Sequence, residues 1–359
     1  MGPNALLSIE TVQFAVVGRI GLITLNRTKA LNALDQAMCL AVDAALKIWG
    51  NDDAIAAVVI RGAGGRAFCS GGDVRLARED GIAWKKGQSD GRIVREFFRD
   101  EYRMDRRIAT FPKPYIALID GITMGGGVGI SVHGRYRLAT ATTLLAMPET
   151  QIGLFPDVGT SYILPRLPGE TGTWLALTGA RLNGADAKLL GLATHLVDHE
   201  RIDDLVDALT APGADIGKVI EAYATQAGEG EVPANRATID RCFAHDRMED
   251  IMAVLEADGG SFAVETATTL RAMSPTSLKL TLKLMRKGRS LELDDCFRMD
   301  YRLSQSVLGG HDFYEGVRAQ LVDKDRNPKW YPATLDAVDD SAIDSLFVPP
   351  LHGDLTFEG

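Results

Sequence analysis

The chain has 359 residues, with 39 lysines and arginines against 48 aspartates and glutamates, so its formal net charge is −9. Apolar residues make up 46% and charged residues 24%, a balance typical of soluble globular proteins with room for a large core. An acidic total disfavours nucleic acid and anionic membranes as partners, because binding to either requires basic surface.

The first 200 residues alternate between short apolar runs, which predict strands, and longer amphipathic runs, which predict helices. Asp35 and Asp73 are expected to cap two of these helices, and a charged amphipathic helix is expected at 92–108. The alternation predicts an α/β unit. The expected strands are 8–12, 15–18, 21–25, 56–60, 114–119, 136–139 and 144–147.

Beyond residue 200 the pattern becomes helical and is interrupted by linkers that contain glycine and proline. Amphipathic helices are expected at 277–286, 291–307 and 313–321. We therefore expect a core at 1–200, a helical region at 201–335, and an acidic tail or wrapped arm at 336–359.

The four cysteines are widely spaced, with no CxxC pair and no Cys/His cluster at zinc spacing. This spacing predicts neither a disulfide framework nor a metal site, and it favours a reducing, cytoplasmic compartment. The N-terminus lacks the basic segment of a signal peptide. The longest apolar run, 54–60, is far shorter than the ~20 residues that span a bilayer.

The segment Ala67-Phe-Cys-Ser-Gly-Gly-Asp73 follows a predicted buried strand and precedes a helix. Adjacent glycines let a ligand approach the backbone closely and leave N–H groups free to stabilise an oxyanion. A tight turn that needs glycine for its dihedral angles explains this segment equally simply, and taken alone it is the preferred interpretation. The thiol and hydroxyl here lack the context of a Cys–His pair or a GxSxG elbow.

A second glycine-rich segment, Gly121-Ile-Thr-Met-Gly-Gly-Gly-Val-Gly129, also follows an apolar strand. It lacks the Lys-Ser/Thr of a P-loop and the GxGxxG spacing. Close helix packing would also require glycine here. Two such turns, each after a buried strand, are better explained by an oxyanion hole with two backbone donors.

Carboxyl groups occur in a third segment, 147–157, where Glu149 and Asp157 lie eight residues apart among apolar, proline and glycine residues. An apolar environment raises the pKa of a carboxyl group and suits it to acid–base work near neutral pH. The alternative is that both acids cap turns next to Pro148 and Pro156, and for this segment taken alone it is the preferred interpretation. Glu101 lies on the helix 92–108 beside Phe97, Phe98 and Tyr102, and it is expected to point inward only if that face is buried.

These segments together resemble the crotonase (enoyl-CoA hydratase/isomerase) superfamily, and within it the branch of 3-hydroxyisobutyryl-CoA hydrolases. The resemblance covers nearly the whole chain and is weakest between about residues 201 and 262. The matching segments are 26–34, 67–73, 113–117, 121–134, 147–159, 177–179, 274–277, 313–319 and 327–330.

The resemblance implies a crotonase-like ββα-spiral core, an acyl-CoA substrate and no separate cofactor. It places the oxyanion donors on the N–H groups of Gly72 and Gly126, and the catalytic carboxyls on Glu149 and Asp157. The expected substrate-binding residues are Glu101, Ser70, Gly71 and Gly125, with Arg27 and Lys29 as candidates for the CoA phosphates. The sequence does not give the oligomeric state; the resemblance makes a homo-oligomer possible, since trimers and hexamers are common in the superfamily.

One departure separates the branches. Hydratases carry a glutamate where this chain has Gly129, and they usually carry glycine where it has Asp157. We therefore expect hydrolysis of a short branched 3-hydroxyacyl-CoA thioester, with 3-hydroxyisobutyryl-CoA from valine breakdown as the first candidate. Hydration or isomerisation of an enoyl-CoA is the alternative on the same scaffold. A non-catalytic acyl-CoA-binding protein is a third, which the three acids disfavour.

Overall fold

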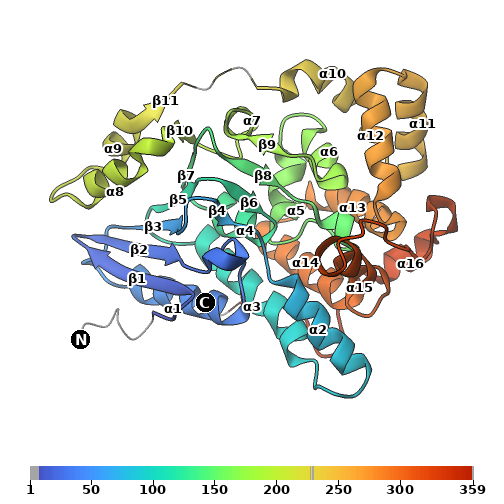
Figure 1. Ribbon diagram of the computed structural model, residues 1–359, viewed down its shortest axis with the longest axis horizontal. Helices are drawn as coiled ribbons and strands as arrows, with labels where there is room; N and C mark the ends of the chain where they lie inside the picture. The colour runs from blue at the N-terminus through green and yellow to red at the C-terminus, as the bar shows by residue number, and fades with distance from the viewer. Residues whose placement is uncertain (1–7, 227, 229, 358–359) are drawn as a thin grey trace. The chain divides into compact units, whose positions relative to one another are not determined.

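The computed structural model describes residues 8–226, 228 and 230–357 (Figure 1). The described residues form two compact units, each assembled from three separate stretches of the chain. Unit 1 comprises 8–72, 103–146 and 181–231, and unit 2 comprises 73–102, 147–180 and 232–357.

Unit 1 contains a seven-stranded sheet in the order β1-β2-β3-β5-β7-β10-β11. The outer pairs β1–β2 and β10–β11 are antiparallel, while the pairs between β2 and β10 are all parallel. The strands are β1 (Val12–Val17), β2 (Ile20–Leu25), β3 (Ala57–Gly62), β5 (Tyr115–Ile119), β7 (Tyr136–Ala139), β10 (His195–Val197) and β11 (Ala224–Thr225).

A second sheet of unit 1 has four strands in the order β4-β6-β8-β9. Consecutive strands alternate between the sheets, so that β3, β5 and β7 of the large sheet are followed by β4, β6 and β8 of the small one. This ββ step followed by helix is the repeat of a ββα spiral. The strands are β4 (Ala67–Cys69), β6 (Ile122–Met124), β8 (Leu144–Ala146) and β9 (Leu182–Asn183).

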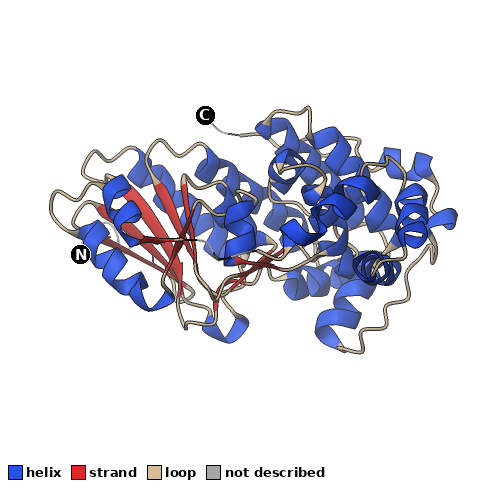
Figure 2. Cartoon of the chain, turned by 90° about the horizontal axis from the view of Figure 1, so that it is seen from above, coloured by secondary structure: helices blue, strands red, loops and turns tan. Residues whose placement is uncertain are grey.

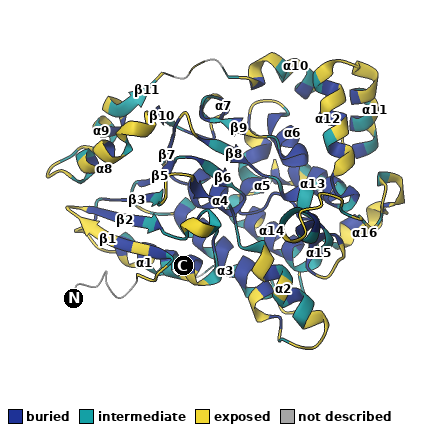
Figure 3. Cartoon of the chain, viewed as in Figure 1, coloured by how far each residue is buried: buried dark blue, intermediate teal, exposed yellow. Residues whose placement is uncertain are grey.

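Helices flank the strands of the large sheet (Figure 2), and apolar side chains fill the space between them. Val59 and Leu118 belong to one core cluster with Leu205 and Ile220, which come from α8 and α9. Edge strand β1 is more exposed, as its colouring in Figure 3 shows. The α-helices of unit 1 are α1 (Gln36–Gly50), α4 (Gly126–Val132), α7 (Gly184–Leu189), α8 (Ile202–Thr210) and α9 (Ile216–Tyr223).

The regular elements that the structure describes in unit 2 are all helical. Helix α3 (Arg92–Ala109) is shared, with its residues up to Tyr102 grouped in unit 2. The other α-helices are α2 (Val74–Lys85), α5 (Thr160–Ile163), α6 (Thr171–Thr178), α10 (Val232–Cys242), α11 (Met248–Asp258), α12 (Ser261–Ala272), α13 (Pro275–Gly288), α14 (Leu293–Val307), α15 (Asp312–Val317) and α16 (Asp340–Ser345).

Short helical turns complete the two units. The 3-10 turns are η2 (Thr28–Ala30), η3 (Glu149–Ile152), η4 (Leu164–Arg166), η5 (His199–Arg201) and η7 (Leu335–Ala337), and η6 (Arg318–Val322) is a π-helical turn.

Local chemistry explains where several helices begin. The Asp35 side chain accepts a hydrogen bond from the Met38 N–H at the start of α1, as expected of an N-cap. Asp73 caps α2 in the same way. Ser274 caps α13, whose first residue is Pro275, a position where the missing N–H costs nothing.

Two element predictions differ from the structure. The strand expected at 8–12 is wrong: the Ser8 hydroxyl accepts a hydrogen bond from Phe14 N–H, the segment makes only an isolated bridge, and β1 begins at Val12. The single helix expected at 313–321 ends at Val317 and continues as a π-turn.

The compact units do not follow the expected boundaries at 200 and 335. Residues 202–223 form α8 and α9, which are grouped with the sheet because their apolar faces cover it. The segment expected to be a tail or an arm contacts α14 of unit 2, where Asp354 pairs with Arg302 and His352 bonds the Tyr301 hydroxyl. Leu355 is buried in the same contact region.

Candidate active site

The first glycine turn follows β4 in unit 1. The Ser70 N–H donates to the Leu31 carbonyl at 3.0 Å, and its hydroxyl donates to the Ala30 carbonyl at 3.2 Å. The Gly71 carbonyl accepts from the Leu34 N–H at 2.8 Å. With a φ of +112°, Gly71 occupies a conformation that side chains rarely adopt. The backbone at this turn is therefore held in one orientation.

The second glycine turn follows β6 and is adjacent to the first. Gly125 has a φ of +49°, and α4 begins at Gly126, so the Gly126 N–H belongs to the first turn, where helical N–H groups have no intrahelical acceptor. A Cβ on Gly71 would lie 3.7 Å from the Gly126 nitrogen. The sequence prediction that two glycine turns converge is thus matched by their geometry in unit 1.

Close packing also explains part of the glycine content. A Cβ on Gly127 would lie 2.1 Å from the Cys69 carbonyl oxygen, closer than any real contact. The packing interpretation therefore holds for Gly127, while Gly126 presents a first-turn N–H. The assignment of Gly72 and Gly126 as oxyanion donors stays a prediction.

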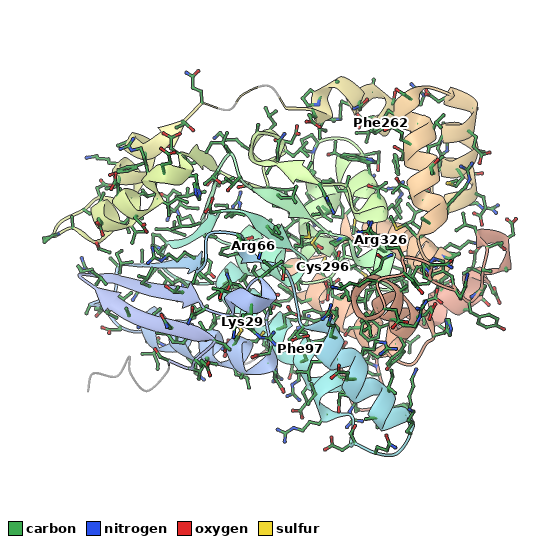
Figure 4. All side chains as sticks on the ribbon, in the orientation of Figure 1. Lys29, Arg66, Phe97, Phe262, Cys296 and Arg326 are labelled. Carbon is green, nitrogen blue, oxygen red and sulfur yellow. The ribbon has the colours of Figure 1, made fainter. Side chains whose placement is uncertain are left out.

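The two basic candidates for CoA phosphates lie before the first turn. Arg27 donates to the Ala33 carbonyl at 3.2 Å and is half-buried. Lys29 lies in η2 with an exposed side chain, labelled in Figure 4. Their assignment to phosphates also stays a prediction.

The carboxyl candidates are all buried within unit 2. Glu149 is the first residue of η3, after Pro148, and Asp157 lies in the loop that precedes α5. Glu101 lies on α3 and is 2% exposed, with Glu149 at 6% and Asp157 at 7%. The inward orientation expected of Glu101 is therefore observed.

Burial raises the pKa of each of these carboxyls. For Glu149 and Glu101 the pKa rises well above its ordinary value, first because of desolvation and then because of the nearby Asp157 carboxyl. The pKa of Asp157 rises to about 6, where desolvation outweighs the hydrogen bond from Tyr102. Groups that exchange protons near neutral pH are suited to general acid–base catalysis.

Two neighbours of this cluster carry no sequence motif. The Tyr102 hydroxyl donates to Asp157 Oδ2 at 2.6 Å. Asp300, on α14 and fully buried, accepts a hydrogen bond from the Gly159 N–H at 2.9 Å. The only sequence signal for Asp300 is its place on the apolar face of a helix, between Phe297 and Leu303.

Some oxygens of the cluster have no protein partner. Among the described residues, Glu101 Oε1, Glu149 Oε2 and Asp300 Oδ1 are buried and make no hydrogen bond. Buried polar atoms are normally paired, so these carboxyl oxygens have hydrogen-bonding capacity left for water or substrate. Across the described ranges, no group of three or more His, Cys, Asp or Glu residues is placed to hold a metal ion.

Comparison with known proteins assigns the family. The sequence profile described as enoyl-CoA hydratase/isomerase matches residues 20–347. The chain belongs to the enoyl-CoA hydratase/isomerase family. This confirms the superfamily predicted from the glycine turns and the carboxyl segment.

Curated members of this family include proteins named 3-hydroxyisobutyryl-CoA hydrolase, mitochondrial. The protein from Danio rerio is 48% identical over 345 residues, which cover 94% of this chain and 89% of that protein. The protein from Homo sapiens is 45% identical over an alignment 361 residues long, which covers 97% of this chain and 91% of that protein. The resemblance to the hydrolase branch is confirmed.

Solved structures of family members confirm the α/β crotonase-like fold. A carnitinyl-CoA dehydratase from Mycobacterium thermoresistibile has a TM-score of 0.92 at 42% identity, covering 98% of this chain and 100% of that one. An enoyl-CoA hydratase from Rhodobacter sphaeroides 2.4.1 has a TM-score of 0.89 at 41% identity, and the match covers 97% of this chain and 100% of that one.

The predicted cytoplasmic location is wrong on this comparison. The hydrolase relatives carry the word mitochondrial in their names. The cysteine argument fails for a physical reason: free, buried thiols are compatible with every reducing compartment and do not distinguish one from another. Separately, no helix in the described part of the chain has the length and apolarity needed to cross a membrane.

Proposed function

We propose that this family member hydrolyses 3-hydroxyisobutyryl-CoA to 3-hydroxyisobutyrate and free CoA. The observation that carries the proposal is 48% identity to a protein named for this activity, in a chain that retains Glu101, Glu149 and Asp157 as buried carboxyls. The family fold and the electrostatics of these groups suit attack by water on a thioester.

The names of the solved relatives favour the alternative, addition of water to a double bond. Two observations argue for hydrolysis over that reaction. Identity to the named hydrolases is higher, at 48% against 42%. Gly129, in buried helix α4, has no side chain with which to activate water where hydratases carry a glutamate.

The thioester oxygen needs stabilisation because it becomes negatively charged when the carbonyl carbon is attacked. We assign this task to the N–H groups of Gly72 and Gly126. Fixed backbone donors do not have to reorganise as charge develops, and each is worth roughly 3 kcal/mol in the transition state.

Glu149 supplies either a base or a nucleophile. As a base, it takes a proton from water, the resulting hydroxide attacks the carbonyl carbon, the C–S bond breaks, and Glu149 returns the proton to the CoA thiolate. As a nucleophile, its carboxylate displaces CoA to give an acyl-enzyme anhydride, which water then hydrolyses. Both routes require the ionised carboxylate of Glu149, a group whose pKa is raised by burial.

Asp157 and Glu101 then orient the reactants. Asp157, with a pKa of about 6, is mostly ionised above neutral pH and can accept a hydrogen bond from water or from the substrate hydroxyl. Glu101, whose pKa is raised by burial, can donate to that hydroxyl in its protonated form. A base and an acid in one cluster divide the proton transfers.

Release of free CoA thiol from 3-hydroxyisobutyryl-CoA tests the proposal. We expect turnover with this substrate and slow or no loss of the conjugated absorbance of crotonyl-CoA. Rapid loss of that absorbance without thiol release would establish the hydratase alternative. Tight binding of acyl-CoA with neither reaction would establish a binding protein.

The variant Glu149→Gln tests the central carboxyl. It keeps the size of the side chain but cannot accept a proton or attack the carbonyl, so we expect kcat to fall at least about 100-fold. Steady-state thiol release measures the change, with circular dichroism to verify folding. A variant with full activity would remove Glu149 from the mechanism.

A further inference from the structure

Tyr102 is a buried aromatic residue of unit 2. Its ring is fully buried and contacts two other rings, Phe98 at 6.0 Å between ring centroids and Phe297 at 6.4 Å. Phe98 comes from the preceding turn of α3, next to Phe97, and Phe297 follows Cys296 on α14; Figure 4 labels Phe97 and Cys296. Burial and these two ring contacts restrict the movement of the phenol.

The Tyr102 hydroxyl donates to Asp157. The 2.6 Å distance between the Tyr102 hydroxyl and Asp157 Oδ2 is short for a hydrogen bond and typical of an O–H donor facing a carboxylate. The bond occupies Oδ2 and leaves Oδ1 as the oxygen of Asp157 that is not engaged by Tyr102.

The main chain around Asp157 is fixed independently. The Asp157 carbonyl accepts from the Thr160 N–H at 2.9 Å and from the Thr160 hydroxyl at 2.7 Å. Val158 and Gly159 follow with φ values of +52° and +75°, and the Gly159 N–H donates to Asp300. With its backbone held in place, the Asp157 carboxyl is oriented by the hydrogen bond from Tyr102 together with one from its own backbone N–H.

We propose that Tyr102 is a positioning residue that holds Oδ2 of Asp157, so that Oδ1 alone handles the reacting water or the substrate hydroxyl. The proposal rests on the proposed function, in which Asp157 takes part in thioester hydrolysis. It adds a residue that the glycine turns and the acidic motif do not include.

The charges around Asp157 make the hydrogen bond from Tyr102 important for the pH dependence of the reaction. The titratable groups that face Asp157 are Glu101 and Tyr102 on α3, Glu149 on η3 and Asp300 on α14. None of these groups carries a positive charge. The hydrogen bond from Tyr102 is the side-chain contact that lowers the pKa of Asp157 and opposes the effect of burial.

The variant Tyr102→Phe removes the hydroxyl and keeps the ring packing. A lost hydrogen bond to the ionised form raises the pKa of Asp157, so we expect the acid limb of kcat/KM to move upward by about one pH unit. At pH 6 the kcat/KM of the variant should be about fivefold below that of the wild type, and near pH 8.5 the two values should be nearly equal. KM should change less than about twofold, because a positioning residue acts through Asp157 and not through its own contact with substrate.

Tyr314→Phe is the matched control, since the Tyr314 hydroxyl is also buried but donates to the Leu308 carbonyl at 2.8 Å. We expect its acid limb to coincide with that of the wild type. An unchanged limb in Tyr102→Phe, or an equal shift in Tyr314→Phe, would overturn the proposal.

Two further measurements keep the outcome decisive. Site-specific 3-fluorotyrosine at position 102 strengthens the donor without disturbing the packing, so the acid limb should move downward; no downward movement would overturn the proposal even if Tyr102→Phe fails to fold. Carboxyl 13C NMR titration, assigned with Asp157→Asn, reads the pKa of Asp157 without any substrate. If the wild type fails to release thiol, the proposed function is refuted. If the pKa of Asp157 is the same with and without the Tyr102 hydroxyl, only the positioning role is refuted.

Discussion

Buried carboxyl groups without cationic partners reduce the stability of a folded protein at neutral pH. The pKa of Asp157 rises from its ordinary value near 4 to about 6 on folding, so the folded state binds the proton more tightly than the unfolded state does. Stability from this group is therefore complete below about pH 4 and is lost as pH rises through 6. Above pH 7 the loss amounts to about 3 kcal/mol, an upper bound that dielectric relaxation reduces. The retention of Asp157 despite this loss is consistent with a functional role.

The variant Asp157→Asn tests this linkage. The amide oxygen still accepts from Tyr102, but the side chain no longer ionises, so we expect stability at pH 7.5 to increase by about 1–3 kcal/mol. At pH 4 the variant and the wild type should unfold at the same temperature. Thermal unfolding at both pH values, monitored by circular dichroism, measures the difference. An equal change at both pH values would show that burial does not perturb Asp157.

At the scale of single elements, glycine serves two purposes in this protein. In α4 it allows a backbone to approach another backbone, since a Cβ on Gly127 would overlap the Cys69 carbonyl. In α9 it serves no such purpose, because a Cβ on Gly217 would meet its nearest atoms at an ordinary 3.6 Å. The sequence shows both as helical glycines, and only the neighbouring strand distinguishes them.

The pair Gly127→Ala and Gly217→Ala makes this distinction measurable. We expect Gly127→Ala to destabilise the protein by about 3 kcal/mol, because the clash is with backbone and cannot be relieved by rotating a side chain. Gly217→Ala should stabilise it by about 0.5 kcal/mol through helix propensity and reduced freedom of the unfolded chain. Urea unfolding gives both values. Similar effects of the two substitutions would contradict the packing argument.

At the scale of the whole molecule, the chain crosses between its compact units repeatedly. Residues 73–102 and 147–180 are grouped with the C-terminal helices, and 202–223 with the sheet. The C-terminal arm, 346–357, returns to α14, the helix that carries Asp300. A sequence boundary between domains cannot describe such an arrangement, because contacts rather than chain order define the units.

The arm contains a matched pair of leucines. Leu355 is 2% exposed and Leu351 is fully exposed. We expect Leu355→Ala to lower the free energy of unfolding by about 2 kcal/mol, at the low end for a buried leucine because an arm can partly close the cavity. Leu351→Ala should change it by less than about 0.5 kcal/mol. Urea midpoints measure both, and an equal response would show that the arm adds no stability.

The sequence by itself determined the fold class, the family and the candidate chemistry of this protein. Buried strands are visible as β-branched runs, and the turns after them as glycine pairs, because both signals depend on a few neighbouring residues. The same locality made Glu149 and Asp157 recognisable as acids within an apolar segment.

Only the tertiary structure decided which residues surround those acids. Tyr102 and Asp300 are separated from Asp157 by 55 and 143 positions along the chain, yet the Tyr102 hydroxyl bonds its carboxyl and Asp300 bonds the Gly159 N–H two residues beyond it. The pKa of a carboxyl depends on solvent exclusion and on charges within a few ångströms, and neither is encoded in sequence spacing. The elevated pKa values of this cluster, and the role proposed for Tyr102, therefore arise from helix packing in unit 2.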